Sequence, residues 1–502
     1  MSKRLDRKLK KLFQLVCRGL DMVKKPISVK ERKECLMSIQ ESVILIGTKV
    51  EKVVPDSEML VEQLSKLAEY IYQLSLGEEM ENHIWRDTYA LCDTIKDEIK
   101  QVLQEKYEIL FLPYKVSMWD SFASVYEAAV NNKECVVRVM PVPYYSVSED
   151  RTGMEMKYEG NQFRNQVAVT DYREYSIEES LPDVIFIHNP YDDTNFVTSL
   201  PEKYFSRELK KYTEHLVYIP YKVCSGDVKD TYCMMPGVTN AWRVFVMSER
   251  VRNTYIKYQD RNKIIATGSP KIDAVIQYEK NPPKMPDEWQ QVLKERKVFL
   301  LNTHLNSLIN QGEKAIQEIR HLISIFEERP QAAILWRPHP LSIETIKSMN
   351  PAILEEYCKL IHEFCELKNS VYDESGDPHM AIALADAYIG DWSSMVTMFG
   401  VTGKPIYVRN ITFPKEKHKN IDISTQSGMT QLLEDVKKQR IKTVYLEKKI
   451  EPETYIDSIL NGRDPLAKER KNEFQNIVCD IDGQAGIHIW NDVWTSITLE
   501  NE

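Results

Sequence analysis

An apolar run ends in a charged, proline-bracketed segment at residues 334–340, which read Ile-Leu-Trp-Arg-Pro-His-Pro. Bulky apolar residues in succession are typical of a buried β-strand. Proline is tolerated in the first turn of a helix, so the segment predicts a strand, a tight turn and a helix. In open α/β sheets, ligands bind at the carboxyl ends of the strands. Arg337 and His339 are therefore candidate ligand-binding residues, although a histidine in a turn can also be incidental.

A second segment of the same kind lies at residues 387–394, which read Ala-Tyr-Ile-Gly-Asp-Trp-Ser-Ser. Asp391 can cap the helix that follows, with or without a ligand nearby. Ser393 and Ser394 then lie in the first helical turn, where the helix dipole favours an anion by roughly 0.3–1 kcal/mol. Two such strand ends in one half of the chain predict a site for a nucleotide diphosphate.

A further helix start lies between these two segments, at residues 377–379 (Asp-Pro-His). It follows the same expected sheet edge, so His379 is a candidate contact for a base or ribose. A plain N-cap with proline in the first turn explains the pattern equally well.

Short apolar strands alternate with helical stretches from about residue 106 onward. The first set of expected strands covers residues 108–112, 136–140, 183–187, 216–219, 243–247 and 263–266. A stiff, polar segment at 281–286 separates it from a second set at 298–301, 333–336, 370–372, 388–389 and 405–408. The alternation predicts an α/β fold of parallel βαβ units. We expect two Rossmann-like domains facing a cleft, at 106–280 and 281–502, with mostly helical residues from about 411.

Residues 1–105 read as a helical N-terminal segment. Apolar residues recur at three- and four-residue steps between Leu5 and Val23, and the other face of this helix is rich in lysine and arginine. A basic amphipathic helix can lie on an anionic membrane surface. It can equally pack its apolar stripe against the rest of the protein, so peripheral membrane contact through residues 1–25 is one of two alternatives.

The composition is that of an ordinary globular protein. The 502 residues carry a formal net charge of −9, which argues against nucleic-acid binding. We find no secretory signal and no run of about 18 apolar residues, so we expect a cytoplasmic location. The nine cysteines form no Cys-x-x-Cys motif and suit a reducing compartment. Nothing in the spacing of Cys, His, Asp or Glu demands a metal, and no cofactor is expected.

Several weak motifs occur together, and at these residues the chain resembles the CDP-glycerol glycerophosphotransferase family, the teichoic-acid polymerase-like enzymes. The likeness covers roughly residues 212–493. It includes segment 337–340 (Arg-Pro-His-Pro) and segment 391–394 (Asp-Trp-Ser-Ser), which in the family is usually Asp-Tyr-Ser-Ser. It also includes segments 268–273 (Gly-Ser-Pro-Lys-Ile-Asp), 403–405 (Gly-Lys-Pro) and 479–483 (Cys-Asp-Ile-Asp-Gly). The resemblance implies a GT-B fold and transfer of glycerol phosphate from CDP-glycerol to a growing polyol-phosphate chain, with release of CMP. Lys404 is a candidate substrate-binding residue within it.

The chain departs from the family pattern at one place. The family carries a Trp-His-Gly-Thr-like element whose histidine is thought to be the base, whereas residues 217–222 here read Val-Tyr-Ile-Pro-Tyr-Lys. Tyr221 stands in this segment and is a candidate substrate contact. His188, which ends an expected strand, and Asp120, which stands near an expected helix start, are alternative acid–base residues. Each also has a structural explanation, as a buried histidine and as a helix cap.

The resemblance implies that an acceptor hydroxyl attacks the β-phosphorus of CDP-glycerol in line, and that CMP leaves. Arg337, His339 and the serine pair would stabilise the charge on the leaving phosphate. The expected partners are CDP-glycerol or a related cytidine nucleotide, and a polyol-phosphate or lipid-linked glycan acceptor. Two alternatives remain: a GT-B glycosyltransferase that uses a UDP- or CMP-sugar, and a non-catalytic nucleotide-binding or scaffold protein of the cell envelope.

Overall fold

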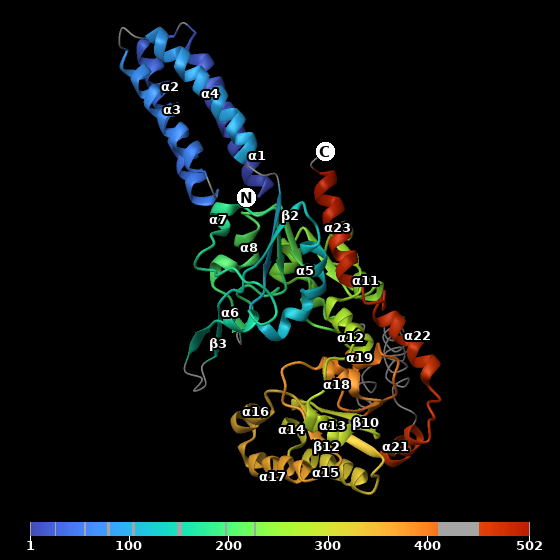
Figure 1. Cartoon of the computed structure of the whole chain (residues 1–502). Helices are drawn as coiled ribbons and strands as arrows, with labels where there is room; N and C mark the ends of the chain where they lie inside the picture. Colours follow the sequence, from blue (N-terminus) through green and yellow to red (C-terminus); the bar gives the residue numbers. More distant parts are fainter. Residues whose placement is uncertain are drawn as a thin grey trace, which may run out of the picture. The chain divides into compact units, whose positions relative to one another are not determined.

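The computed structural model describes residues 2–25, 27–54, 57–77, 81–102, 106–147, 153–195, 198–224, 227–409 and 451–500. They form a mixed α/β fold with parallel sheets, preceded by four long helices (Figure 1). The expected α/β class with an N-terminal helical segment is confirmed. No helix among these residues is long and apolar enough to cross a membrane. Of the helical tail expected from about 411, residues 411–450 lie outside the described residues.

The chain folds into two compact units. The first unit comprises residues 1–116, 126–218 and 235–244, and the second comprises 117–125, 219–234 and 245–502. The expected division into three parts, with boundaries near 105 and 280, stays a prediction. Residues 281–286 do lie between two helices, α12 (Pro270–Lys280) and α13 (Asp287–Leu293), and contain neither helix nor strand.

Four helices open the first unit: α1 (Lys3–Val23), α2 (Val29–Val53), α3 (Glu58–Leu76) and α4 (Glu81–Val102), drawn in blue in Figure 1. Ser2 caps α1 by accepting the Leu5 N–H, and Ser28 opens α2 with a capping box. The apolar stripe of α1, including Phe13 and Leu20, is buried in the core shared with the other three helices. Packing therefore accounts for the stripe, and membrane contact through residues 1–25 stays a prediction.

A parallel sheet follows in the first unit. Its strands are β1 (Tyr107–Leu112), β2 (Cys135–Val139), β5 (Val184–Ile187), β7 (His215–Tyr218) and β8 (Arg243–Val246), in the order β2-β1-β5-β7-β8. The Asp183 carboxylate accepts the N–H groups of Lys3, Arg4 and Glu108, each at 2.8 Å, and so joins the start of α1 to this sheet. A small antiparallel sheet, which the sequence did not predict, contains β3 (Tyr144–Val147), β4 (Met154–Lys157) and β6 (Thr198–Ser199).

The short helices are α5 (Ala123–Val130), α6 (Gly160–Phe163), α7 (Ile177–Ser180), η2 (Glu202–Tyr204), α8 (Ser206–Leu209) and α10 (Pro236–Asn240).

The second unit contains the sheet that positions the candidate site. Its strands are parallel and run in the order β12-β11-β10-β13-β14: β10 (Lys297–Thr303), β11 (Ala332–Pro338), β12 (Ser370–Tyr372), β13 (Ala387–Gly390) and β14 (Ile406–Val408). Helices α15 (Glu313–Glu327) and α17 (Leu354–Cys365) share a core with these strands, in which Trp336 and Phe364 pack edge to face. Apart from Lys297, the exposed first residue of β10, the three central strands are buried on both faces, as expected of a parallel sheet.

The remaining elements of the second unit are mostly helices. They are η1 (Val116–Ser121), α9 (Asp230–Cys233), α11 (Glu249–Tyr255), η3 (Arg261–Lys263), β9 (Ile264–Ala266), α14 (Leu305–Gln311), α16 (Ser342–Met349), η4 (Pro351–Ile353), α18 (His379–Leu384), α19 (Ser394–Gly400), α21 (Pro452–Leu460), α22 (Ala467–Ile477) and α23 (Ala485–Leu499). Every strand expected from the sequence is present, with its ends within two residues of the expected position. The helical tail is described from 451 onward.

Candidate functional site

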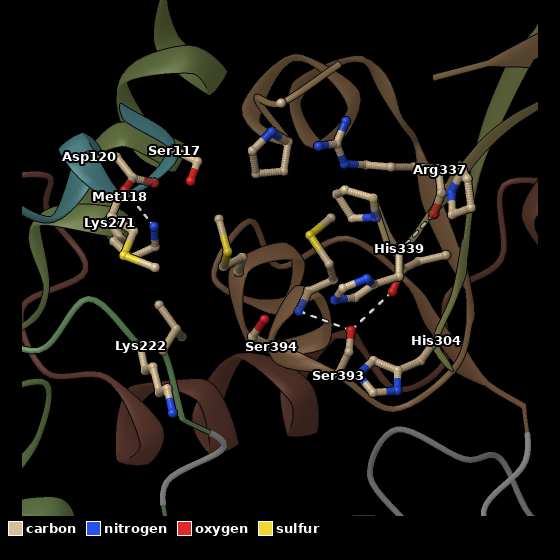
Figure 2. A pocket seen from close by; sticks show the side chains of 18 of the residues that line it. Ser117, Met118, Asp120, Lys222, Lys271, His304, Arg337, His339, Ser393 and Ser394 are labelled. Carbon is tan, nitrogen blue, oxygen red and sulfur yellow. Dashed lines mark hydrogen bonds and ion pairs between the residues drawn. The ribbon is translucent and has the colours of Figure 1, made fainter. Parts of the chain in front are cut away.

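A cavity of about 550 Å³ lies within the second unit. Its volume falls in the range of roughly 300–1,000 Å³ that is usual for small-molecule sites. The carboxyl ends of β10, β11 and β13 supply one wall, with His304, His339 and Ser394 (Figure 2). Asp120 and Lys271 lie on the other side of the view and come from η1 and α12. The cavity is therefore built by the sheet edge at which the sequence predicted a ligand.

The structure brings together six of the ten residues singled out from the sequence. The cavity is lined by Asp120, Tyr221, Arg337, His339, Ser393 and Ser394. The other four, His188, His379, Asp391 and Lys404, are not among the residues that line it. A substrate contact stays a prediction for all ten residues. Their positions and hydrogen-bond partners are described in turn below.

Asn302 joins the three strand ends. Its side-chain Nδ2 donates to the main-chain oxygen of Arg337 at 3.0 Å, and its Oδ1 accepts the Ser393 hydroxyl at 3.0 Å. Only 6% of Asn302 is exposed. One buried amide thus links β10, β11 and the start of α19. Breaking either hydrogen bond would leave a buried polar group without a partner, which costs free energy of folding.

Gly390 provides the close approach of two strands beneath this amide. A Cβ atom placed on Gly390 would lie 2.3 Å from the main-chain oxygen of Asn302 and 2.8 Å from its nitrogen. Those atoms belong to the backbone of a strand, so they cannot move aside as a flexible side chain could. Glycine is therefore required here by space, since any side chain would push β13 away from β10.

We expect Gly390→Ala to lower the free energy of unfolding by about 1–3 kcal/mol, the usual cost of overpacking. Chemical denaturation of the full chain measures it. Gly376→Ala is the matched control, because a Cβ atom at Gly376 meets no atom within 4 Å. Equal effects of the two substitutions would contradict the steric argument.

Arg337 does not offer a free cation to the cavity. Its Nη1 contacts the Asp373 carboxylate at 2.5 Å and the Ser375 hydroxyl at 3.1 Å, and its Nη2 donates to the Ser375 main-chain oxygen at 2.7 Å. The two side chains of the ion pair are 6% and 1% exposed. Arg337 therefore holds the loop 373–376, of which Gly376 lines the cavity, and its expected contact with a phosphate stays a prediction.

The Asp391 carboxylate is hydrogen-bonded to neighbouring backbone and side chains. Its Oδ2 accepts the His304 N–H at 2.8 Å and the Ser307 hydroxyl at 3.0 Å, while its Oδ1 accepts the Arg409 Nε–H at 2.8 Å. The N-cap of α19 is Ser393, whose hydroxyl accepts the Met395 N–H at 3.2 Å. Asp391 thus secures the turn into α14, and the capping role suggested for it belongs to Ser393. Its predicted contact with a substrate stays a prediction.

His339 lies beside a second histidine, His304, which was not a candidate from the sequence. The rings of His304 and His339 meet edge to face with their centroids 5.6 Å apart, and both line the cavity. The Nδ1 atom of His339 accepts the Leu341 N–H at 3.1 Å. A neutral imidazole with Nδ1 as acceptor carries its proton on Nε2, so His339 keeps a ring N–H as a donor.

Burial lowers the pKa of His339, and the neighbouring His304 lowers it further. The neutral, Nε2–H form of His339 therefore persists to more acidic pH than is usual for histidine. Because the unfolded chain binds this proton more readily, His339 makes the fold less stable as pH falls from about 6.5 toward the lowered pKa.

We expect His304→Asn to raise the pKa of His339 part of the way back toward 6.5, because it removes the smaller of the two causes. Proton NMR titration of the imidazole signals measures the pKa, with His339→Gln to assign the resonance. His362→Asn, at an exposed position of α17, is the control. A pKa that does not move in His304→Asn would contradict the pairing.

The remaining candidates have other surroundings. The Lys404 Nζ donates to the Glu279 carboxylate at 2.6 Å and to the main-chain oxygen of Ala383 at 3.1 Å, near the end of α18. His188 follows β5 in the first unit, fully buried, with its ring 5.2 Å from that of Tyr114. The roles predicted for these two residues stay predictions, and the structure places neither in the lining of the cavity.

Several lining residues were not singled out from the sequence. Asn302, Thr303 and His304 follow directly after a strand that was expected at 298–301. The rule applied to the two other strand ends would have singled them out. Lys222 and Lys271 belong to two segments discussed above, 217–222 and 268–273, but neither lysine was itself a candidate binding residue. Across the described ranges, no cluster of three or more His, Cys, Asp or Glu is suited to holding a metal.

No protein-family model and no curated protein matches this sequence. Among solved structures, MnaA of S. aureus with UDP has a TM-score of 0.47 and 12% identity, covering 79% of this chain and 98% of its own. A UDP-GlcNAc 2-epimerase from Neisseria meningitidis bound to UDP-GlcNAc has a TM-score of 0.45 and 14% identity, covering 77% and 100%. A variant of the wall teichoic acid polymerase TagF has a TM-score of 0.47 and 13% identity, covering 88% and 98%. At these scores the likeness carries no argument about activity.

Proposed function

We propose that the cavity binds a cytidine nucleotide donor of the CDP-glycerol type, and that the chain transfers the polyol phosphate to a hydroxyl acceptor with release of CMP. One observation carries the proposal. Three segments of the family resemblance, at 268–273, 337–340 and 391–394, are far apart in the sequence, yet each contributes residues to the same cavity. The sheet by itself brings the ends of β11 and β13 to one edge, so it is the addition of Lys271 from α12 that supports a common ligand.

The charges around the cavity suit a diphosphate. Lys222 and Lys271 supply ammonium groups among the lining residues, and His339 supplies a ring N–H. Asp120 is the lining carboxylate and is paired with Lys271 at 2.5 Å. A few local donors are enough to hold an anion in a protein with a net charge of −9.

The proposed transfer would use these groups in the following way. The acceptor hydroxyl attacks the β-phosphorus in line, and negative charge grows on the leaving CMP. The His339 Nε2–H and the Ser394 hydroxyl stabilise that charge, while Asp120 takes the proton of the attacking hydroxyl. Asp120 thereby replaces the histidine that this chain lacks at residues 217–222.

The proposal includes the wider setting implied by the resemblance. It comprises a GT-B arrangement of domains at 106–280 and 281–502, a cytoplasmic location at the membrane surface, and an acceptor that is a polyol phosphate or a lipid-linked glycan. The proposed reaction then belongs to the synthesis of a cell-wall or surface polymer.

A ligand titration tests the proposal first. Thermal-shift and calorimetric titrations of the full chain would use CDP-glycerol, CDP-ribitol, CMP, UDP and UDP-sugars. A ligand at 100 times its dissociation constant stabilises the fold by about 2.7 kcal/mol, which gives a clear shift. We expect cytidine ligands to bind and CDP-glycerol to yield CMP when an acceptor is present. Preference for uridine ligands would replace the donor by a UDP-sugar, and no binding at all would favour the scaffold alternative.

A further inference from the structure

Two cysteines lie on neighbouring helices of the bundle α1–α4, within the first unit. Cys17 is on α1 and Cys92 is on α4, and these helices lie side by side (Figure 1). Cys92 belongs to the core that the four helices share, and Cys17 packs against that core. Cys92 is 1% exposed, whereas Cys17 is half-buried. One thiol of the pair is therefore accessible and the other is enclosed.

The register of α1 against α4 brings the two thiols together. The Tyr89 hydroxyl donates to the Asp21 carboxylate at 3.0 Å, and the Lys24 ammonium lies 5.2 Å from the centre of the Tyr89 ring. Short connections join each helix of the bundle to the next, so α1 and α4 run in opposite directions. Asp21 stands one turn after Cys17 on α1. Tyr89 stands one turn before Cys92 on α4, so Cys17 and Cys92 lie opposite each other.

The contact between the two thiols makes them chemically unequal. The Cys92 S–H donates to the Cys17 sulfur, and this hydrogen bond lowers the pKa of Cys17 more than burial raises it. The Lys96 ammonium also lowers the pKa of Cys17, against the carboxylates of Asp21 and Asp93. The same hydrogen bond, together with burial, raises the pKa of Cys92. Because the thiolate is the nucleophile, Cys17 is the attacking sulfur and Cys92 is the thiol that stays protonated.

We propose that Cys17 and Cys92 form an oxidisable dithiol, which a low-molecular-weight disulfide converts into a disulfide bond between α1 and α4. The Cys17 thiolate attacks one sulfur of the reagent, the S–S bond of the reagent breaks, and one thiolate leaves. Cys92 then loses its proton to the released thiolate and attacks the Cys17 sulfur, which displaces the second thiolate. Two thiols of the protein are oxidised, and the reagent is reduced to two molecules of thiol that carry the two protons.

The first step of this exchange prepares the second. Once Cys17 is bonded to the reagent, its sulfur carries no negative charge and no longer raises the pKa of Cys92, although burial still does. The second step then takes place between two sulfurs that are already in contact. The enclosed position of Cys92 keeps the reagent away from it, so the order of the steps is fixed by access.

The disulfide fastens the bundle at the end where it meets the parallel sheet of the first unit. The start of α1 is held to that sheet by Asp183, which accepts the N–H groups of Lys3 and Arg4 at 2.8 Å, and α4 leads into β1. A bond between α1 and α4 encloses α2 and α3 in a covalent loop, which restricts the unfolded chain. In a reducing compartment such a bond is transient and forms when the surroundings become oxidising.

Disulfide mapping of the full chain tests the proposal. The reduced protein is incubated with oxidised glutathione, quenched with acid at intervals, alkylated, and mapped by mass spectrometry without reduction. We expect glutathione on Cys17 first and a bond between Cys17 and Cys92 afterwards. Cys92→Ser should stop the reaction at the mixed disulfide of Cys17, and Cys17→Ser should leave Cys92 unmodified. A Cys92 that is still reduced in the wild type after the exposed Cys35 has reacted would overturn the proposal.

Two exposed cysteines of the second unit serve as an internal control. Cys358 and Cys365 lie on the same helix, α17, about 10 Å apart along its axis, which exceeds the roughly 7 Å limit between the Cα atoms of a disulfide. Both should therefore stop at the mixed disulfide with glutathione. A bond between them would show that the chain had unfolded during the reaction.

Thermal unfolding gives a second readout of the same bond. The melting midpoint of the oxidised wild type should lie about 5–10 °C above that of the reduced protein, and Cys92→Ala should show no such rise. Cys92→Ala also replaces Cys92→Ser in the mapping if the serine variant does not fold. An oxidised wild type that melts no higher than the reduced protein would contradict the fastening of the bundle. Neither measurement uses a nucleotide, so both are independent of the proposed transfer.

Discussion

Replacing His339 with alanine is expected to slow CMP release from CDP-glycerol by about 10²–10⁴-fold. The ring contributes its Nε2–H because Nδ1 already accepts the Leu341 N–H at 3.1 Å. That donor faces a cavity built by three strand ends, where negative charge would develop on the leaving phosphate. The loss should appear mainly in kcat, since the donor is used most strongly in the transition state.

Steady-state kinetics with a coupled CMP assay measures the effect. His362→Ala removes a histidine from the exposed face of α17 in the same unit and should leave kcat unchanged. His339→Gln retains a side-chain N–H donor and should recover part of the rate. A His339→Ala variant that slows the reaction less than about fivefold would exclude this residue from charge stabilisation.

Replacing Arg337 with alanine is expected to lower the free energy of unfolding by about 3–5 kcal/mol. The substitution leaves the Asp373 carboxylate, whose side chain is 1% exposed, without its cation. It also removes the bonds to Ser375, so the loop that contributes Gly376 to the cavity loses its support. The cost comes from a buried, uncompensated charge, because in water the pair itself would be worth little.

Denaturant unfolding of the full chain gives the comparison. Arg320→Ala is the control, since Arg320 and its partners Glu356 and Glu363 lie on the surface and should contribute at most about 1 kcal/mol. The double substitution Arg337→Leu with Asp373→Leu removes both charges and should recover much of the stability. If Arg337→Ala is no more destabilising than Arg320→Ala, the ion pair is not the support of this loop.

Local patterns in the sequence were sufficient to predict the secondary structure around the site. The runs at 298–301, 333–336 and 388–389 became β10, β11 and β13, because apolar residues flanked by turn signals have few alternatives to a buried strand. The antiparallel strands β3, β4 and β6 were not predicted. Their residues alternate too briefly for the period to be recognised, and β4 is exposed along its length.

The candidate site was predicted in part. The rule that ligands bind at strand ends selected His339 and the serine pair, and the structure brings them to one cavity. The same rule was not applied to the end of β10, so Asn302 and His304 were missed. Lys271 stood out only as part of a motif, since nothing in the sequence indicates that it meets Asp120, which lies 151 positions away.

The residues alone are enough to establish an α/β chain with a helical N-terminal segment and to locate the ends of its strands. They do not show which side chains at those ends are already bound to other residues of the protein, because such pairing depends on the tertiary structure. Arg337 is paired with Asp373, Asp391 with Arg409 and Lys404 with Glu279, while His304 and Asp120 reach the cavity. A strand depends on neighbouring residues and so can be read locally. An ion pair depends on the position of a partner that the sequence places elsewhere.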